Sequence, residues 1–308
     1  MASLEVLRPG MLTTVQDLGR FGQGHLGVPQ QGAVDSYALR WALRLAEAPE
    51  DAPALEITLM GPVLVVREAC FAGLAGAELG ARLNGDPWPA GESRRLAAGD
   101  RIAFGTPDRR GLRAYLAFAG GIAVDCILGS RSTDLQSRVG GLGGRALVTG
   151  DVLEVGDGPG IPARAPVPTA ILQEAVRVLP GPRDELFPAE ALRRLTSEPY
   201  TVTPQVDRVG MRLFGPAIHG APGDIPSEGV PLGAVEILPS GQPIVLLQGR
   251  GSIGGYPVLA TVISADVPVL AQLRPGDRAR FAAVDLPTAQ AARRALEENL
   301  ALPLLSLD

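Results

Sequence analysis

An uninterrupted polar run near the middle of the chain is the first candidate for chemistry. It comprises Ser130, Arg131, Ser132, Thr133 and Asp134, and it lies between an apolar segment and a glycine-rich stretch at residues 140–150. Guanidinium, hydroxyl and backbone N–H groups bind anions, and arginine pairs with carboxylate or phosphate through two parallel hydrogen bonds. The run therefore predicts an anion-binding loop, a partner-facing loop or a plain corner of the chain.

The chain contains no lysine, so all of its 28 basic side chains are arginines. A phosphate-binding loop of the usual ATPase kind needs a lysine that reaches the nucleotide phosphates. Schiff-base catalysis through lysine and covalent attachment of biotin are excluded for the same reason. Recognition of phosphate or carboxylate must therefore depend on arginine and on backbone N–H groups.

Metal binding and nucleophilic catalysis have little support in the sequence. His25 and His219 are the only histidines, and neither has a second histidine or a cysteine at ligand spacing. The stretch GRGSIGG at residues 249–255 differs from a G-x-S-x-G nucleophile elbow and is followed by Tyr256 and a proline rather than a helix. We expect no metal site, no covalent cofactor and no Ser/His/Asp triad in this chain.

The composition is that of an ordinary globular protein, with 46% hydrophobic residues, 20% charged residues and a net charge of -5. This charge gives no electrostatic reason to expect a nucleic-acid partner. No apolar stretch is long enough for a membrane span, and the N-terminus lacks the pattern of a signal peptide. We therefore expect a cytoplasmic protein without a membrane association, in which Cys70 and Cys126 are buried free thiols.

Short apolar runs separated by Gly, Pro and Asp predict a mainly β fold with a few short helices. Asn84 and Gly85 predict a tight hairpin, because both central positions of that turn require a positive φ. Three helices are expected at about residues 34–48, 188–196 and 287–300, the first of them capped by Asp35 or Ser36.

A proline- and glycine-rich stretch divides the chain near its middle and predicts a linker between two lobes. The expected boundaries are 1–156 for the N-terminal lobe, 157–169 for the linker and 170–308 for the C-terminal lobe. A faint internal repeat supports this division. Residues 27–35 and 55–66 resemble residues 229–247 with a helix deleted, and AGDRIAFG (98–105) resembles PGDRARFA (275–282), with TGDVLEVG (149–156) of the same form. Recurrence of Gly-Asp turns by chance is the alternative explanation.

Six motifs occur in order along nearly the whole chain: TTVQDLGRFGQGHLGVPQQGAVD (13–35), LEITLMGP (55–62), the segment from LAFAGGI to TGD (116–151), DRVGMRL (207–213), SEGVPLGAV (227–235) and GGYPVLATV (254–262). Together they resemble the KipA / allophanate hydrolase subunit 2 family, also called the biotin-dependent carboxyltransferase family. The resemblance implies two cyclophilin-like β-barrel lobes that together form one carboxyltransferase-type domain.

The same resemblance implies a C-type component of a hetero-oligomeric 5-oxoprolinase, which opens 5-oxo-L-proline to L-glutamate with ATP and Mg²⁺. The implied partners are a KipI-like B-type subunit, a LamB/YcsF-like A-type subunit and a small lactam or amide substrate. Two alternatives stay open. One is the carboxyltransferase module of a urea carboxylase-type biotin enzyme, and the other is a non-catalytic KipA-like regulator that binds a KipI-like kinase inhibitor.

The family motifs also supply the candidate site residues. The candidates for catalysis are Asp17, Arg20, Arg131, Asp207, Arg208 and Glu228. The candidates for substrate binding are Ser130, Ser132, Thr133, Arg212, Gly255 and Tyr256. Local salt-bridged turns are the alternative for the Asp17–Arg20 and Asp207–Arg208 stretches, and helix capping is the favoured role of Asp35.

Two segments depart from the family pattern. Residues 206–210 read VDRVG where the family commonly has Ser-Asp-Arg-Met-Gly, so the Asp-Arg pair survives. Where the family usually has Asp-Arg-Gln-Thr-Thr before Gly-Gly-Tyr-Pro, this chain has Gly249, Arg250, Gly251, Ser252 and Ile253. A carboxylate, an amide and a hydroxyl are therefore missing, which puts the identity of the substrate in doubt more than the fold.

Overall fold

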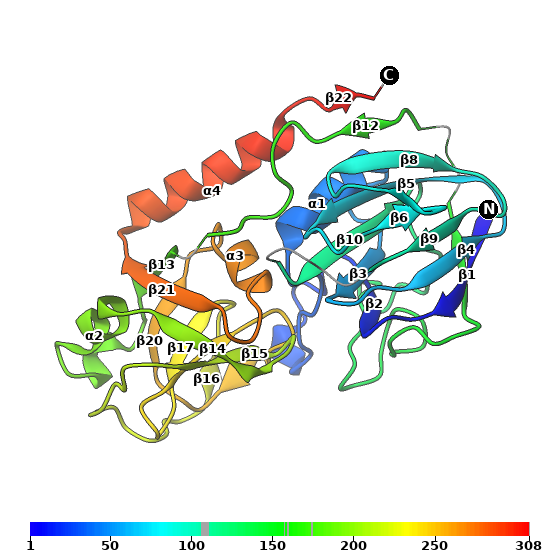
Figure 1. Ribbon diagram of the computed structural model, residues 1–308. Helices are drawn as coiled ribbons and strands as arrows, with labels where there is room; N and C mark the ends of the chain where they lie inside the picture. The colour runs from blue at the N-terminus through cyan, green and yellow to red at the C-terminus, as the bar shows by residue number, and fades with distance from the viewer. Residues whose placement is uncertain (106–110, 157, 159, 174, 308) are drawn as a thin grey trace. The chain divides into compact units, whose positions relative to one another are not determined.

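The computed structural model describes residues 1–105, 111–156, 158, 160–173 and 175–307 (Figure 1). The described chain is mainly β, with 33% of residues in strands and 15% in helices, which confirms the predicted fold class. It divides into two compact units. Unit 1 comprises Met1–Arg20, Gln31–Ile171 and the C-terminal residues from Asn299, and unit 2 comprises Phe21–Gln30 and Leu172–Glu298.

Unit 1 contains two sheets. The six-stranded sheet has the order β11 (Val152–Val155), β1 (Ala2–Arg8), β4 (Val63–Val66), β9 (Arg101–Ala103), β6 (Arg82–Leu83) and β7 (Asp86–Pro87). The seven-stranded sheet has the order β2 (Leu12–Gln16), β3 (Ala54–Thr58), β10 (Arg113–Phe118), β5 (Cys70–Gly76), β8 (Glu92–Leu96), β12 (Ala163–Arg164) and β22 (Leu305–Ser306). Leu4 and Leu64 of the first sheet share one hydrophobic core with Leu55 and Leu116 of the second.

Helix α1 (Ser36–Leu45) packs on β5 and β10 of unit 1. Asp35 caps the start of this helix: its Oδ1 accepts a hydrogen bond from the Ala38 backbone N–H at 2.9 Å. The predicted helix and its cap are therefore confirmed, although the helix is shorter than the expected range 34–48. Glu47 has a φ of 53°, a left-handed conformation that follows the end of the helix.

The Asn84–Gly85 hairpin forms as predicted. Asn84 has a φ of 55° and Gly85 a φ of 95°, and the flanking strands β6 and β7 pair antiparallel through Arg82–Pro87 and Leu83–Asp86. The turn type follows directly from the two residues that tolerate a positive φ.

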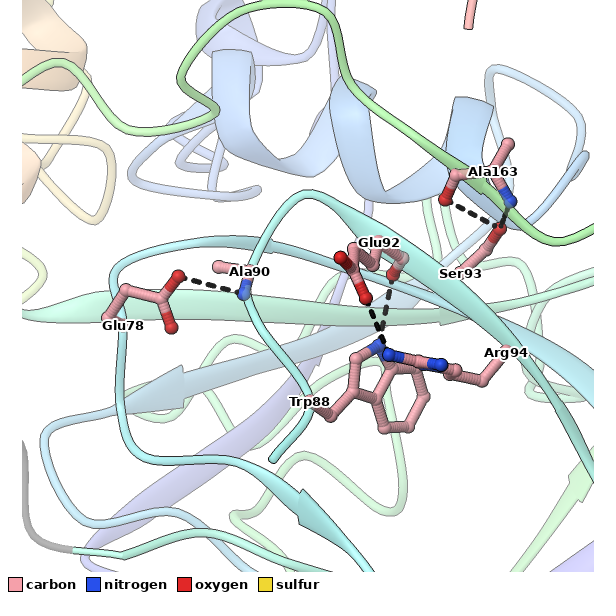
Figure 2. Close-up of polar contacts among 7 residues, drawn as sticks. All are labelled: Glu78, Trp88, Ala90, Glu92, Ser93, Arg94 and Ala163. Atoms are coloured by element: carbon pink, nitrogen blue, oxygen red, sulfur yellow. Dashed lines mark hydrogen bonds and ion pairs between the residues drawn. The ribbon is translucent and has the colours of Figure 1, made fainter. Parts of the chain in front are cut away.

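The described part of the expected linker, residues 158 and 160–169, belongs to unit 1. It contributes the short strand β12, which pairs with β8 and β22. Figure 2 shows how the Ser93 hydroxyl binds this segment: it accepts from the Ala163 backbone N–H at 2.9 Å and donates to the Ala163 carbonyl at 3.2 Å. Pairing at the edge of the sheet satisfies backbone N–H and C=O groups of this segment, which in a solvent-exposed linker would bind water.

The same close-up shows how the neighbouring turn is held. The Trp88 indole N–H donates to the Glu92 carbonyl at 3.1 Å, and the Glu92 carboxylate pairs with Arg94 at 2.6 Å. Glu78 accepts from the Ala90 backbone N–H at 3.0 Å. These contacts order the edge of the sheet on which β12 pairs.

Unit 2 is a closed β-barrel, as the resemblance implied for this lobe. Its strands follow the order β13 (Ala175–Pro180), β20 (Val258–Val262), β17 (Ala234–Ile237), β18 (Pro243–Leu246), β15 (Gly210–Phe214), β14 (Tyr200–Val206) and β21 (Arg278–Ala283). A separate two-stranded sheet is formed by β16 (Glu228–Gly229) and β19 (Ile253–Gly254).

Two of the helices near unit 2 were predicted and one was not. Helices α2 (Ala191–Ser197) and α4 (Leu286–Ala301) match the expected ranges 188–196 and 287–300. Helix α3 (Val267–Ala271) was missed, because all five of its residues are buried and it lacks the polar face that marks a surface helix. Two single-turn 3₁₀ helices occupy Gly24–Leu26 and Asp184–Leu186.

The repeated Gly-Asp motifs form the same turn three times. The carboxylates of Asp100, Asp151 and Asp277 each accept a hydrogen bond from the backbone N–H three residues earlier, at 2.7–2.8 Å. Each aspartate also donates its own backbone N–H to the carbonyl of that earlier residue. The repeated motif therefore corresponds to a repeated structure in both units.

No helix among the described residues is both long and apolar enough to span a bilayer. Both cysteines are free, as expected, but only Cys70 is buried. Burial raises the pKa of the Cys70 thiol to about 12. Cys126 is exposed, which corrects the expectation of two buried thiols, because it lies in the loop after β10 rather than in a strand.

Candidate functional site

The Asp17 carboxylate is the centre of a buried hydrogen-bond network in unit 1. It follows β2 and is 5% exposed. Its Oδ1 accepts from the Gly19 backbone N–H at 2.8 Å, from the Ser130 hydroxyl at 2.7 Å and from the Ser132 hydroxyl. Its Oδ2 accepts from the Arg131 backbone N–H at 2.5 Å. Four donors thus surround one carboxylate. Three of them come from the Ser130–Asp134 loop, so Asp17 holds in place a loop that lies more than one hundred residues later in the sequence.

Arg20 holds the same loop from a second side and is only 2% exposed. Its Nε donates to the Ile127 carbonyl at 3.2 Å, and its Nη2 donates to the Ser132 carbonyl at 2.5 Å. Gly140, with a φ of 74°, packs so closely on the Ser132 carbonyl and the Arg20 guanidinium that a Cβ would overlap both. The buried guanidinium therefore satisfies carbonyl groups of the loop.

The hydroxyls of the polar run point into the protein. Ser130, Ser132 and Thr133 are at most 1% exposed, and the Thr133 hydroxyl donates to the Val15 carbonyl at 2.9 Å. These groups build the loop, and substrate contacts from them stay a prediction. Asp134 closes the loop by accepting from the backbone N–H groups of Gln136 and Ser137.

Arg131 differs from its neighbours in the loop. Its backbone is fixed by Asp17 on one side and by the Gly141 N–H, which donates to the Arg131 carbonyl at 2.9 Å, on the other. Arg131 is half-buried, and its guanidinium makes no hydrogen bond or ion pair with the part of the chain that the structure describes. A fixed backbone with an unpaired guanidinium is an arrangement suited to binding an external anion.

Of the candidates in unit 2, Asp207 shapes a turn. Asp207 is exposed, and its Oδ1 accepts from the backbone N–H groups of Val209 and Gly210 at 2.7 and 3.1 Å, between β14 and β15. Arg208 is buried, and its carbonyl accepts from the Gly249 N–H at 2.6 Å. A Cβ at Gly249 would lie 2.9 Å from that carbonyl, so the family's usual aspartate at this position would not fit without a shift. Arg212 is exposed on β15.

The remaining candidates lie around the β16–β19 sheet. Glu228 is half-buried on β16 and pairs with the Arg183 Nε at 3.2 Å. The Gly255 carbonyl accepts from the Ile225 N–H at 2.8 Å, and the next residue, Tyr256, is 39% exposed. The β16–β19 pairing sets Glu228 opposite Gly254, so Glu228 and the Gly254–Tyr256 segment share one small region of unit 2.

The structure adds Glu236, which the sequence analysis did not select. Glu236 lies on β17, is 4% exposed, and its Oε1 has no hydrogen-bond partner among the described residues. Burial raises the pKa of its carboxyl to about 7. A Cβ at Gly254 would lie 2.8 Å from this oxygen, so the carboxyl lies directly against the Gly254–Tyr256 segment. The signal in the sequence was a lone acidic residue inside the apolar strand AVEI.

The half-buried Arg250 contributes a second buried polar atom without a partner among the described residues. Arg250 Nε donates to the Val230 carbonyl at 3.0 Å, while its Nη1 is buried without a partner in the described chain. Burial lowers the pKa of this guanidinium. No cluster of metal-ligating side chains is found among the residues that the structure describes.

Comparison with known proteins gives the family. Residues 26–283 match the family described as the carboxyltransferase domain, subdomain A and B. The C-type subunit of 5-oxoprolinase from Escherichia coli is 37% identical over 293 residues, which are 94% of this chain and 94% of that protein.

Two solved structures are similar over nearly the whole chain. The K. lactis urea amidolyase superposes with a TM-score of 0.91 and 30% identity, over 99% of this chain and 20% of that one. The crystal structure of TTHA0988 gives a TM-score of 0.83 and 40% identity, over 92% of this chain and 56% of that one. This chain therefore spans about a fifth of the first and somewhat more than half of the second. The family match and the ordered motifs agree, and the chain belongs to the carboxyltransferase-domain family that includes the C-type subunit of 5-oxoprolinase.

Proposed function

We propose that this chain is the C-type subunit of an ATP-dependent 5-oxoprolinase complex that hydrolyses 5-oxo-L-proline to L-glutamate. The observation that carries the proposal is the match with the Escherichia coli C-type subunit, which is 37% identical and covers 94% of both chains. The urea amidolyase match covers nearly all of this chain but only 17% of the relative. The coverage of nearly all of both sequences supports a role of the C-type kind for this chain.

The side chain of Arg131 supports the binding of a small molecule that carries a carboxylate. The unpaired guanidinium of Arg131 suits a carboxylate or phosphate, because arginine binds both through two hydrogen bonds. Asp17 and Arg20, first considered for catalysis, hold the Arg131 loop in place. In this proposal they are positioning residues, and Arg131 is the residue of the loop that touches the ligand.

The proposal assigns the energy-consuming step to the assembled complex. Opening a lactam is made favourable by phosphorylating the carbonyl oxygen at the expense of ATP, after which water attacks the activated carbon and releases phosphate. ATP with Mg²⁺, a KipI-like B-type subunit and a LamB/YcsF-like A-type subunit complete the system. The proposal assigns no ATP-binding residue to this chain, which has no lysine.

A second candidate is transfer of a carboxyl group from carboxybiotin to an amide-like acceptor such as urea. The superposition on urea amidolyase with a TM-score of 0.91 supports it. Because the chain has no lysine, the biotin would be carried by another protein.

Reconstitution separates the two candidates. The chain is co-expressed with the two partner subunits and purified as a complex, and glutamate release from 5-oxo-L-proline is followed with and without ATP. We expect glutamate only when all three subunits and ATP are present. A complete complex that releases no glutamate and hydrolyses no ATP in response to 5-oxo-L-proline contradicts the proposal, and biotin-dependent carboxylation of urea would favour the second candidate.

A further inference from the structure

A groove in unit 2 lies between the outer wall of the barrel and helix α4. Its volume is about 520 Å³, and small-molecule sites in proteins usually enclose about 300–1,000 Å³. It is lined by β13, by β20 and the turn after it, by the start of α3, by the chain before β17 and by α4. All of its lining residues belong to unit 2, so the groove is not formed by the Arg131 loop, which belongs to unit 1.

The barrel side of the groove is set by strand register. Leu179 of β13 lies opposite Thr261 of β20, so the two side chains lie on the same face of the sheet. Val178, the residue before Leu179, is fully buried, and successive side chains of a strand point to opposite faces. Val178 therefore faces the barrel interior, whereas the half-buried Leu179 and Thr261 face outward into the groove.

The other side of the groove is one face of α4. Asp285 caps this helix, because its Oδ1 accepts from the Thr288 backbone N–H at 3.0 Å. Ala289 packs in one apolar cluster with Ile263, which follows β20, and this contact holds the helix on the barrel. Leu286 and Arg293 lie one turn before and one turn after Ala289 on the same face, and both border the groove.

The walls of the groove are apolar on three sides. Leu179, Leu232 and Leu286 come from three different segments, and none of the three is fully buried. Leu286 is 57% exposed, although it lies at the edge of a packed helix. An apolar chain that entered the groove would remove water from all three leucines, which is favourable.

The charged groups that line the groove are all of one sign. Among the described lining residues the only ionisable side chains are Arg293 and Arg294 of α4. Arg294 makes no hydrogen bond or ion pair with the described part of the chain. Arg293 pairs with Glu297 at 3.5 Å, and an exposed pair of this kind contributes little to stability. Arg293 can therefore exchange this partner for an anion from outside.

The combination of walls and charges restricts the class of ligand. A cation would be repelled by the two arginines, and a wholly apolar molecule would leave them unused. A molecule with an apolar chain and an anionic head satisfies both features, because guanidinium binds carboxylate through two parallel hydrogen bonds.

We propose that the groove between α4 and the β13–β20 wall is a binding site for a small amphiphile with an unbranched apolar chain and a carboxylate head. The chain lies against Leu179, Leu232 and Leu286, and the carboxylate binds Arg294 and Arg293 at the mouth. This site goes beyond the proposed function, since it needs neither ATP nor a second subunit.

The test is a titration of the full chain with decanoate, kept below its micelle concentration and followed by isothermal titration calorimetry. Butyrate keeps the head and shortens the chain, and decyltrimethylammonium keeps the chain and reverses the charge. The test variants are Arg293→Gln/Arg294→Gln and Leu286→Asp. Their matched controls are Arg278→Gln, at an exposed arginine of β21, and Leu172→Asp, at a 47% exposed leucine of unit 2. Neither control residue lines the groove.

We expect decanoate to bind at least about tenfold more tightly than butyrate or decyltrimethylammonium, because only decanoate uses both the walls and the arginines. The double arginine variant should lose about tenfold in affinity for decanoate. Leu286→Asp should lose at least as much, because it places a negative charge beside the carboxylate. Both control variants should bind decanoate within about twofold of the original chain.

Three results would overturn the inference: no binding of decanoate, equal binding of decyltrimethylammonium, or unchanged decanoate affinity in the folded test variants. A membrane surface is a different source of the same chemistry, and flotation with phosphatidylglycerol vesicles distinguishes it. Flotation that requires Arg293 and Arg294, without binding of free decanoate, would also overturn the inference. Glutamate release by the assembled complex has no bearing on any of these outcomes, so this inference and the proposed function can fail separately.

Discussion

The Arg131 backbone N–H donates to Asp17 Oδ2 at 2.5 Å, which joins the end of β2 to a loop 114 residues later in the chain. The same carboxylate accepts from Gly19 and from the hydroxyls of Ser130 and Ser132. The backbone position of Arg131 thus depends on a buried acid.

Asp17→Asn should destabilise unit 1. The amide nitrogen would face donors that now bind a carboxylate oxygen, and each hydrogen bond to a charged group contributes about 1.5–3 kcal/mol. We expect the free energy of unfolding in urea to fall by about 3 kcal/mol. Asp207→Asn is the matched control, because Asp207 is exposed and accepts through Oδ1 alone, which asparagine retains. An equal, small loss in both variants would contradict the role of Asp17.

Arg131→Ala should leave stability and assembly unchanged and reduce activity. Its guanidinium has no partner among the described residues, so the free energy of unfolding should change by less than about 0.5 kcal/mol. Loss of a charged hydrogen-bonding group to the ligand should lower kcat/KM for glutamate release by about 10- to 100-fold. The measurement is steady-state turnover of the purified complex, with subunit stoichiometry checked by light scattering. Unchanged turnover would show that the loop has a structural role only and that Arg131 does not contact the ligand.

Gly140→Ala and Gly143→Ala separate backbone strain from steric overlap. Both glycines have a positive φ, 74° and 67°, so both variants should lose about 1–2 kcal/mol from strain. Gly143 has open space around it, whereas a Cβ at Gly140 would overlap the Ser132 carbonyl and the Arg20 guanidinium. We expect Gly140→Ala to cost about 1–3 kcal/mol more than Gly143→Ala in thermal or chemical unfolding. Equal losses would show that the Arg20 contact does not constrain the loop.

Glu236 should make the stability of the protein depend on pH. Its pKa is about 7 in the folded state and close to 4.5 when unfolded, so between these values the unfolded state releases a proton that the folded state keeps. The free energy of unfolding therefore falls as the pH rises from about 4.5 to 7, and this contribution is constant above 7. At 1.36 kcal/mol per pH unit the total is on the order of 3 kcal/mol.

Glu236→Gln should remove that contribution. Urea unfolding at pH 5 and pH 8, compared between the original chain and the variant, measures it directly. A variant that is more stable than the original chain at pH 8, and close to it at pH 5, is the expected outcome. Identical pH profiles for the two proteins would show that Glu236 is ionised in the folded state.

The elements that sequence analysis predicted correctly are those whose causes are local. Asp35 caps α1 through a bond to a residue three positions away, and the Asn84–Gly85 turn needs only the φ angles of those two residues. The three Gly-Asp turns are closed within four residues of chain. The family resemblance also depended on ordered motifs, which are a property of the sequence alone.

Only the tertiary structure decided how distant residues are paired. It showed that Asp17 is enclosed by Ser130 and Ser132, that Ala163–Arg164 add a strand to unit 1, and that Glu236 is buried beside Val258 where Glu56 has Tyr115. These outcomes depend on cross-strand register and on burial, which are set by contacts between segments far apart in the chain. The physical reason is that a side chain's hydrogen-bond partners and its exposure to water are properties of the packed structure, whereas caps and tight turns are properties of a few consecutive residues.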